Sequence, residues 1–293
     1  MIAQDHTKTD ITAIGLVTVA SKKLKQQGNE LARRDADLML AHVLAIEPAS
    51  IPLFSDSISR SQQSLFEQMI DRRLAGEPVA YITGEQGFWS LDFYVNQHTL
   101  IPRPDTELLV EVGLETVQTV THPHIADLGT GSGCILLSLL SECPQMTGVG
   151  VDISTEALDV AKRNAVRHGL GVQAHFVQSN WFDSLAGEQF SLIVSNPPYI
   201  PAGDIGGLMS DVRDYEPVSA LDGGQDGLDY YRCISEQATS YLAEEGCLAF
   251  EVGIGQFSQV SSIMEHNEYA EIQVFPDLAG VNRVVIGKKP KES

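Results

Sequence analysis

The feature that most constrains the fold is a regular alternation of strand-like and helical segments that begins after about residue 99. Short apolar runs separated by helical stretches are the pattern of a mostly parallel sheet. The predicted strands are His124–Leu128, Gly148–Val151, Val172–Val177, Phe190–Val194, Cys247–Val252, Glu271–Phe275 and Val281–Ile286. The predicted helices include Ile135–Leu140, Thr155–His168, Tyr230–Leu242 and Gln256–Glu265. We therefore expect an α/β fold with a doubly wound, Rossmann-like sheet of seven strands, which binds ligands at the carboxyl ends of its strands.

A smaller all-helical domain precedes this sheet. Residues 10–74 have helical periodicity in three segments, and Ser59 followed by Gln62 predicts a capping box at the start of the third. Gly76-Glu77-Pro78 ends that segment, and the β-branched and aromatic run Val79–Val95 predicts a strand pair or an irregular linker. The expected domains are a helical substrate-binding domain at 1–77, a β-hairpin linker at 78–100 and the sheet domain at 101–293.

The charge of the chain separates classes of substrate. The formal net charge is −20, and residues 101–293 hold 27 acidic against 10 basic residues. Nucleic acids are bound by Lys and Arg that displace counterions, so a domain of this sign disfavours broad binding of DNA or RNA. We expect a protein or small-molecule substrate and no direct contact with nucleic acid.

The cysteines and the N-terminus indicate the compartment. Four cysteines without paired spacing, and no His cluster, predict neither a disulfide framework nor a metal site. The N-terminal segment has no apolar signal region, and no apolar run approaches the length of a membrane span. We expect a soluble, unprocessed cytoplasmic protein with no membrane partner.

A glycine-rich turn follows the first strand of the sheet domain. The segment Asp127-Leu-Gly129-Thr130-Gly131-Ser132-Gly133 stands between a strand and a helix, where glycines allow a ligand to approach the helix N-terminus closely. The next strand ends in Asp152, a carboxylate that can accept hydrogen bonds from both hydroxyls of a ribose. A nicotinamide dinucleotide loop would need Gly or Ala at Cys134, which weakens that interpretation. An ordinary turn and a helix-start acid remain the alternatives.

The most informative motif is Asn196-Pro197-Pro198-Tyr199, directly after the strand Phe190–Val194. Two prolines fix the backbone and remove two donors, which leaves carbonyl acceptors in a set direction. The Asn196 side chain and the Pro197 carbonyl can hold the two N–H groups of a planar nitrogen while Tyr199 packs on the planar group. The motif therefore predicts a site that methylates such a nitrogen, with Asn196, Pro197 and Tyr199 as catalytic residues.

Two questions stay open at the level of residues. Arg103 and Glu107 either line the active site or form an ion pair at the domain junction. The tetrapeptide also fits an enzyme that methylates a nucleic-acid amino group, although such an enzyme would need a basic groove. As a further alternative, the tetrapeptide is a simple turn in a regulator that binds a cofactor without catalysis.

Taken together, several motifs resemble the peptide chain release factor glutamine methyltransferase family (PrmC/HemK), whose members are class I S-adenosylmethionine-dependent methyltransferases. The resemblance covers essentially the whole chain and rests on Gly84–Phe93, Ile101–Glu107, Ser179–Phe182, Asn196–Tyr199, Glu216–Leu221, Gly223–Leu228 and Asp277–Val284. Adenine-N6 DNA methyltransferases and guanine-N2 RNA methyltransferases share only the tetrapeptide. Pro104–Glu107 favours the release-factor branch over the sister enzymes that methylate a ribosomal protein glutamine.

The resemblance implies a seven-stranded methyltransferase sheet and a residue-by-residue assignment of the site. S-adenosyl-L-methionine, which leaves as S-adenosyl-L-homocysteine, would be bound by Asp127, Gly129, Thr130, Gly131, Ser132, Gly133, Asp152, Trp181 and Asn196. The acceptor glutamine, from the Gly-Gly-Gln loop of a class 1 release factor, would be held by Asn196, Pro197, Pro198 and Tyr199. We expect a monomer. Asn180 departs from the Asp that relatives commonly carry before the Trp, which affects a detail of adenine recognition.

Overall fold

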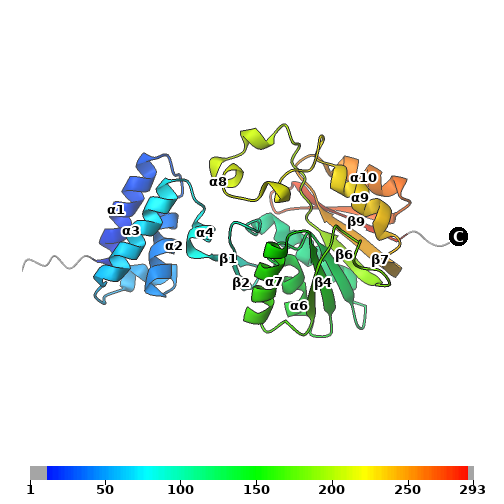
Figure 1. Cartoon of the computed structure of the whole chain (residues 1–293), viewed down its shortest axis with the longest axis horizontal. Coiled ribbons are helices and arrows are strands. Elements are labelled where there is room, and N and C mark those ends of the chain that lie inside the picture. Colours follow the sequence, from blue (N-terminus) through cyan, green and yellow to red (C-terminus); the bar gives the residue numbers. More distant parts are fainter. Residues whose placement is uncertain (1–11, 290–293) are drawn as a thin grey trace, which may run out of the picture. The chain divides into compact units, whose positions relative to one another are not determined.

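A computed structural model describes residues 12–289, which fall into two compact units that divide after Gly84 (Figure 1). Residues 1–11 and 290–293, at the outer ends of the expected first and last domains, lie outside the described residues. The domain limits expected at 1–77, 78–100 and 101–293 stay predictions. Among residues 12–289, no helix combines the length and the apolar composition that a membrane crossing requires.

The first unit is all-helical. It consists of α1 (Ala13–Gln26), α2 (Ala32–Leu44), the 3-10 helix η1 (Pro48–Leu53), α3 (Arg60–Leu74) and α4 (Val79–Thr83). The apolar positions that recur with helical period in α1, α2 and α3 turn inward and form one core, which includes Val17, Leu24, Met39, Leu40 and Phe66. Helical periodicity therefore predicted this unit correctly.

The capping box expected at the start of α3 is present. The Ser59 hydroxyl accepts from the backbone N–H of Gln62 at 3.2 Å, and the Gln62 side chain accepts from the backbone N–H of Ser59 at 2.9 Å. These two bonds satisfy N–H groups that the first helical turn leaves without partners.

One short segment differs from its predicted conformation. The β-branched residues of Val79–Thr83 predict a strand, but this segment is the helix α4, entered through Pro78 and ended by Gly84 at φ 74°. Burial of Ala80, Tyr81 and Ile82 outweighs a weak strand propensity. The expected strand pair begins directly after it.

The second unit contains the predicted hairpin and a seven-stranded sheet. The hairpin pairs β1 (Glu85–Phe88) antiparallel with β2 (Leu91–Tyr94). The strands of the sheet are β3 (His124–Leu128), β4 (Thr147–Asp152), β5 (Ala174–Gln178), β6 (Phe190–Ser195), β7 (Leu242–Glu251), β8 (Ala270–Pro276) and β9 (Asn282–Lys288). Their order is β5-β4-β3-β6-β7-β9-β8, parallel except where β9 runs antiparallel to β7 and β8.

Helices cover both faces of this sheet. Those that pack on its strands are α5 (Glu107–Val117), α6 (Cys134–Glu142), α7 (Thr155–Arg167), α9 (Asp229–Ala238) and α10 (Phe257–His266). The unit also contains the short helices η2 (Pro104–Thr106), η3 (Ile205–Gly207), α8 (Ser210–Arg213) and η4 (Val218–Ala220). In β6, Leu192 faces Gly113 of α5, whereas the next residue, Ile193, belongs to the core formed with α9 and α10. Because successive strand residues point to opposite faces, the sheet is doubly wound, as predicted. Figure 1 shows α6 and α7 beside β4, and α9 and α10 beside β7 and β9.

The topology fixes where a ligand meets the sheet. The chain runs from β3 outward to β4 and β5 and then returns to the other side of β3 as β6, so the switch point lies between β3 and β6. The glycine loop follows β3 and the Asn-Pro-Pro-Tyr segment follows β6. Both loops therefore stand at the position where open α/β sheets bind ligands.

One predicted helix is too long. The sequence predicts helix over Tyr230–Leu242, but α9 ends at Ala238 and β7 already begins at Leu242. The Phe190 N–H donates to the Tyr241 carbonyl at 2.8 Å, so the end of this segment pairs with β6 as a strand. A short apolar run fits either period, and here the long-range pairing decides.

Candidate active site

A pocket of about 410 Å³ opens at the carboxyl ends of β3, β4 and β6. Four segments line it, and all of them belong to the second unit. They are the loop before α5 (Gln97, His98, Thr99, Leu100, Pro102, Arg103, Thr106), the glycine loop and its helix (Gly129, Thr130, Gly131, Ser132, Cys134, Ile135), the β4–β5 side (Val151, Asp152, Ile153, Ser154, Ala157, Ser179, Asn180, Trp181) and the β6 side (Asn196, Pro198, Pro217, Ser219, Ala220, Tyr230).

The glycine loop is held by the neighbouring strand. The backbone N–H groups of Gly129 and Thr130 both donate to the Val151 carbonyl at 2.8 Å, and the Gly131 N–H donates to Asp152 Oδ2 at 3.0 Å. Gly131 has φ 53°, and a Cβ built there would meet no atom within 4 Å, so the loop is open toward the pocket. A positive φ of this kind favours glycine.

Asp152 connects this loop to the helix that follows β4. Its Oδ1 accepts from the Ser154 N–H at 2.9 Å while its Oδ2 accepts from Gly131, so the carboxylate ties the loop to the start of α7. Burial raises the pKa of Asp152, against the lowering effect of these backbone donors. Each carboxylate oxygen can accept more than one hydrogen bond, so capacity for ligand hydroxyls remains.

Asp127 lies behind the loop and not on the pocket wall. It is fully buried, and its Oδ2 accepts from the Thr130 hydroxyl at 2.6 Å and from the Leu136 N–H at 3.3 Å. Burial raises the pKa of Asp127 to about 7. Among the described residues, its Oδ1 has no hydrogen-bond partner, although it is buried.

The Asn-Pro-Pro-Tyr segment begins beside the glycine loop. The Ser195 hydroxyl donates to the Leu128 carbonyl at 2.7 Å, which joins the last residue of β6 to the last residue of β3. The residue after β6 is Asn196, which lines the pocket, and Asn196 Nδ2 donates to the Thr106 hydroxyl at 3.4 Å. The glycine loop and the Asn-Pro-Pro-Tyr segment are therefore fixed to each other.

The end of this segment is supported by residues far away in the sequence. Gln256 Nε2 donates to the Tyr199 carbonyl at 2.9 Å, and Gln256 Oε1 accepts from the Gly253 N–H at 3.0 Å. A Cβ built at Gly227 would lie 2.3 Å from the Tyr199 oxygen, and one at Gly223 would lie 2.7 Å from the Pro198 oxygen. The Gly223–Leu228 motif and Gln256 thus pack directly against the Asn-Pro-Pro-Tyr segment.

Two aromatic side chains stand at the other end of the pocket. The rings of Trp181 and Tyr230 have centroids 5.1 Å apart and an interplanar angle of 55°, and Trp181 also faces Gly129. Trp181 adopts φ 51°, an uncommon conformation for a side chain of this size. Each of these rings has a flat apolar face on which a planar ligand can pack.

The structure answers the question about Arg103 and Glu107. Arg103 lines the pocket and pairs with the buried Glu216, whereas Glu107 accepts from the Trp89 N–H at 2.7 Å and does not line it. Between them, Asp105 pairs with Arg283 at 2.8 Å. The Ile101–Glu107 motif therefore binds together segments that are distant in the sequence.

The predicted site residues occupy two positions. Those that line the pocket are Gly129, Thr130, Gly131, Ser132, Asp152, Trp181, Asn196 and Pro198. Those that support it from behind or beside are Asp127, Gly133, Pro197 and Tyr199, of which Pro197 is buried and Tyr199 packs against the α9–α10 core. Burial raises the pKa of Tyr199 to about 12. The catalytic, cofactor and substrate roles assigned to these twelve residues remain proposals.

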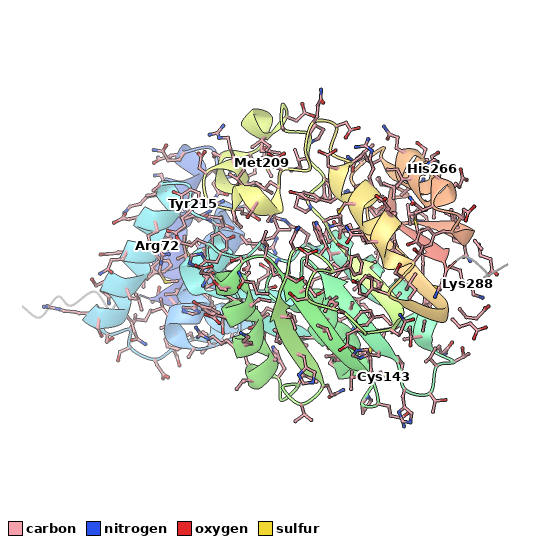
Figure 2. The ribbon with its side chains drawn as sticks, turned by 45° about the vertical axis from the view of Figure 1, so that its right-hand side comes forward. Arg72, Cys143, Met209, Tyr215, His266 and Lys288 are labelled. Atoms are coloured by element: carbon pink, nitrogen blue, oxygen red, sulfur yellow. The ribbon has the colours of Figure 1, made fainter. Side chains whose placement is uncertain are left out.

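Sequence reasoning missed several residues of the pocket. Ser219 and Ala220 line it from the segment between β6 and α9, for which no element was predicted, and Tyr230 lines it from the first turn of α9. Figure 2 shows Met209 and Tyr215 on the same segment, which is built of short helical turns. The only sequence signals there were the Glu216–Leu221 and Gly223–Leu228 motifs, and neither says which side chains face a pocket.

Comparison with known proteins identifies relatives of both units. Residues 16–84 match the PrmC N-terminal domain family, and residues 104–206 match the methyltransferase small domain family. The release factor glutamine methyltransferase of Rhodospirillum rubrum is 43% identical over 268 residues, which cover 91% of this chain and 82% of that protein. The protein of the same name from Vibrio cholerae is 40% identical over 284 residues, which cover 96% of this chain and 98% of that protein.

A solved structure supports the fold. A methyltransferase from Pyrococcus furiosus aligns with a TM-score of 0.51 at 16% identity, covering 77% of this chain and 98% of that chain, so it shares the fold alone. Identity near 40% over almost the full length of both curated proteins goes further than a common fold. This chain belongs to the release factor glutamine methyltransferase family.

Proposed function

We propose that the protein transfers a methyl group from S-adenosyl-L-methionine to the side-chain amide nitrogen of the glutamine in the Gly-Gly-Gln loop of class 1 peptide chain release factors. The observation that carries the proposal is the Ser195–Leu128 hydrogen bond, which places the glycine loop and Asn196 at one pocket. A methyl transfer needs its donor and acceptor sites side by side and in line. Membership of the family gives the donor and acceptor their chemical identity.

The pocket residues fit the cofactor. The open Gly131 and the acceptor capacity of Asp152 match an amino acid end and a ribose. The Trp181–Tyr230 pair suits a purine ring. When bound, S-adenosyl-L-methionine supplies an electrophilic methyl group on a sulfonium, and S-adenosyl-L-homocysteine leaves.

The acceptor side must compensate for a weak nucleophile. The lone pair of a glutamine amide nitrogen is delocalised into its carbonyl, so the amide must be held in the reactive orientation. We assign the Asn196 side-chain oxygen and the Pro197 carbonyl to accept its two N–H groups, with Pro198 and Tyr199 shaping the site. Catalysis then rests on positioning and on electrostatic support of the changing charge.

The partner follows from the same proposal. The helical first unit would bind the release factor while the second unit carries out the chemistry. The acidity of residues 101–293 supports a protein substrate in preference to direct nucleic-acid binding. We propose further that the protein acts as a monomer in the cytoplasm, where release factors work.

The test is transfer of label from S-adenosylmethionine to a purified release factor. A factor whose loop reads Gly-Gly-Gln should be labelled, and the same factor with Gly-Gly-Ala should not. Equal labelling of the two factors would refute the assignment of the acceptor. Labelling of RNA in preference to the factor would support the nucleic-acid alternative.

A further inference from the structure

Glu251 is a buried carboxyl group to which no role has yet been assigned. It ends β7, and its neighbour Phe250 pairs with Ser195, so Glu251 stands beside Asn196 at the carboxyl edge of the sheet. It is 2% exposed, and its Oε2 has no hydrogen-bond partner among the described residues. Burying an ionisable group costs free energy unless the group is hydrogen-bonded or paired with an opposite charge.

The hydrogen-bond partners of Glu251 include Asn196, a residue of the proposed acceptor site. Burial raises its pKa to about 7, and hydrogen bonds from the Thr106 and Asn196 side chains act against that rise. Thr106 is itself buried, and its hydroxyl also lies 3.4 Å from Asn196 Nδ2. Thr106 and Asn196, which line the pocket, therefore form one polar cluster with Glu251, which does not line it.

The chemistry of the three groups sets the direction of their hydrogen bonds. A carboxylate only accepts, and a hydroxyl has one proton to donate. If Thr106 gives that proton to Glu251, its oxygen is left to accept from Asn196 Nδ2. Asn196 then has its amide N–H groups engaged by the protein, and its oxygen is the atom free to meet a ligand.

We propose that Glu251 is a positioning residue that orients the Asn196 amide, both directly and through Thr106, so that the acceptor pocket presents an oxygen and selects a group with N–H donors. The inference rests on the proposed function and deepens it. A glutamine amide satisfies such a pocket, whereas the carboxylate of a glutamate would meet an acceptor with an acceptor.

The first test compares three variants in steady-state methylation of a release factor. Glu251→Gln can donate an N–H to Thr106, which reverses the direction of the hydrogen bonds in the cluster. Thr106→Val removes the hydroxyl at almost constant volume. We expect each to lower kcat about 10-fold or more, with the KM for the release factor within about 3-fold. Thr106→Ser keeps the hydroxyl, is the matched control, and should keep kcat within about 3-fold.

A double variant separates positioning from general structural damage. Because Glu251 and Thr106 act on one atom, Glu251→Gln combined with Thr106→Val should be no slower than the worse single variant, within about 3-fold. S-adenosylmethionine affinity by calorimetry and Tm should stay close to those of the unmodified protein in each variant. If Glu251→Gln does not fold, the Thr106→Val and Thr106→Ser pair still decides.

Two results would overturn the inference. One is kcat within about 3-fold of the unmodified protein in both Glu251→Gln and Thr106→Val, and the other is a double variant whose losses multiply. Absence of methylation by the unmodified protein would instead refute the proposed function, so the two failures are distinguishable.

Discussion

The two loops of the pocket are stabilised in different ways. The glycine loop is held by the end of the next strand in the chain, β4, with Gly129 and Thr130 bonded to Val151 and Gly131 bonded to Asp152. The Asn-Pro-Pro-Tyr segment is held from several parts of the chain, because its contacts come from Thr106, Gln256 and the Gly223–Leu228 motif. The glycine loop is thus positioned within one β–α–β unit, whereas the Asn-Pro-Pro-Tyr segment, the proposed acceptor segment, is positioned by contacts from elements before and after it in the chain.

This difference separates binding of the cofactor from catalysis. Damage to the glycine loop should weaken cofactor affinity, and damage around the acceptor segment should lower turnover while leaving that affinity nearly intact.

The largest expected effect is that of Asn196→Ala on turnover. Removing the side chain leaves one N–H of the substrate amide without an acceptor and loosens its orientation, so kcat should fall about 1,000-fold. The affinity for S-adenosylmethionine, measured by calorimetry, should change by less than about 3-fold. A large loss of affinity with little loss of kcat would reverse the roles of the two loops.

The next effect concerns Asp127 and pH. Its pKa is raised to about 7 in the folded protein, above the ordinary value of an unfolded aspartate, because burial disfavours the charged form. The folded state therefore binds more protons between about pH 4 and 7, and this group makes the protein less stable as pH rises through that range. Asp127→Asn should remove a decline on the order of 4 kcal/mol in the free energy of unfolding.

Urea unfolding at several pH values measures this effect. Glu251, whose pKa is raised to about 7 by the same cause, should leave a second decline of the same sign in the Asp127→Asn variant. A profile unchanged by Asp127→Asn would show that this carboxyl is already ionised in the folded protein.

A third effect tests the distant support of the acceptor segment. Gly227 has φ 76°, and an added Cβ would lie 2.3 Å from the Tyr199 backbone oxygen. Gly227→Ala must therefore displace the backbone at Gly227 or at Tyr199. We expect kcat to fall about 30-fold with a lower Tm, and cofactor affinity to change little. Gly203→Ala, in the same segment but with open space at the Cβ position, is the control and should be silent.

The smallest effect is on cofactor binding. Asp152→Ala removes the acceptor of the Gly131 and Ser154 N–H groups and should weaken S-adenosylmethionine binding about 10- to 100-fold. At saturating cofactor, kcat should stay within about 5-fold. Asp159→Ala, on the exposed side of α7, provides a matched carboxylate control. Equal effects of the two substitutions would remove Asp152 from the cofactor site.

The same contrast explains which parts of the site could be predicted from the sequence. Gly129–Gly133 and Asp152 are recognisable because a βα turn and the end of the next strand are local patterns. Asn196–Tyr199 is recognisable because two prolines after a strand restrict the backbone, whatever surrounds them.

The supports of the acceptor segment could not be predicted in this way. Thr106 meets Asn196 across 90 residues, and Gln256 meets Tyr199 across 57. No periodicity links such pairs, and Glu251 looks like any polar residue at the end of a strand. The fold followed from alternation and burial, but the overlong helix at Leu242 shows that strand pairing decides where a short apolar run ends its helix.

The most direct test of the account is mass spectrometry of a release factor after incubation with the protein and S-adenosylmethionine. The account predicts a single added methyl group, located by fragmentation on the glutamine of the Gly-Gly-Gln loop, and its absence when Asn196→Ala replaces the unmodified protein. A methyl group on any other residue of the factor, or equal methylation by Asn196→Ala, would contradict it.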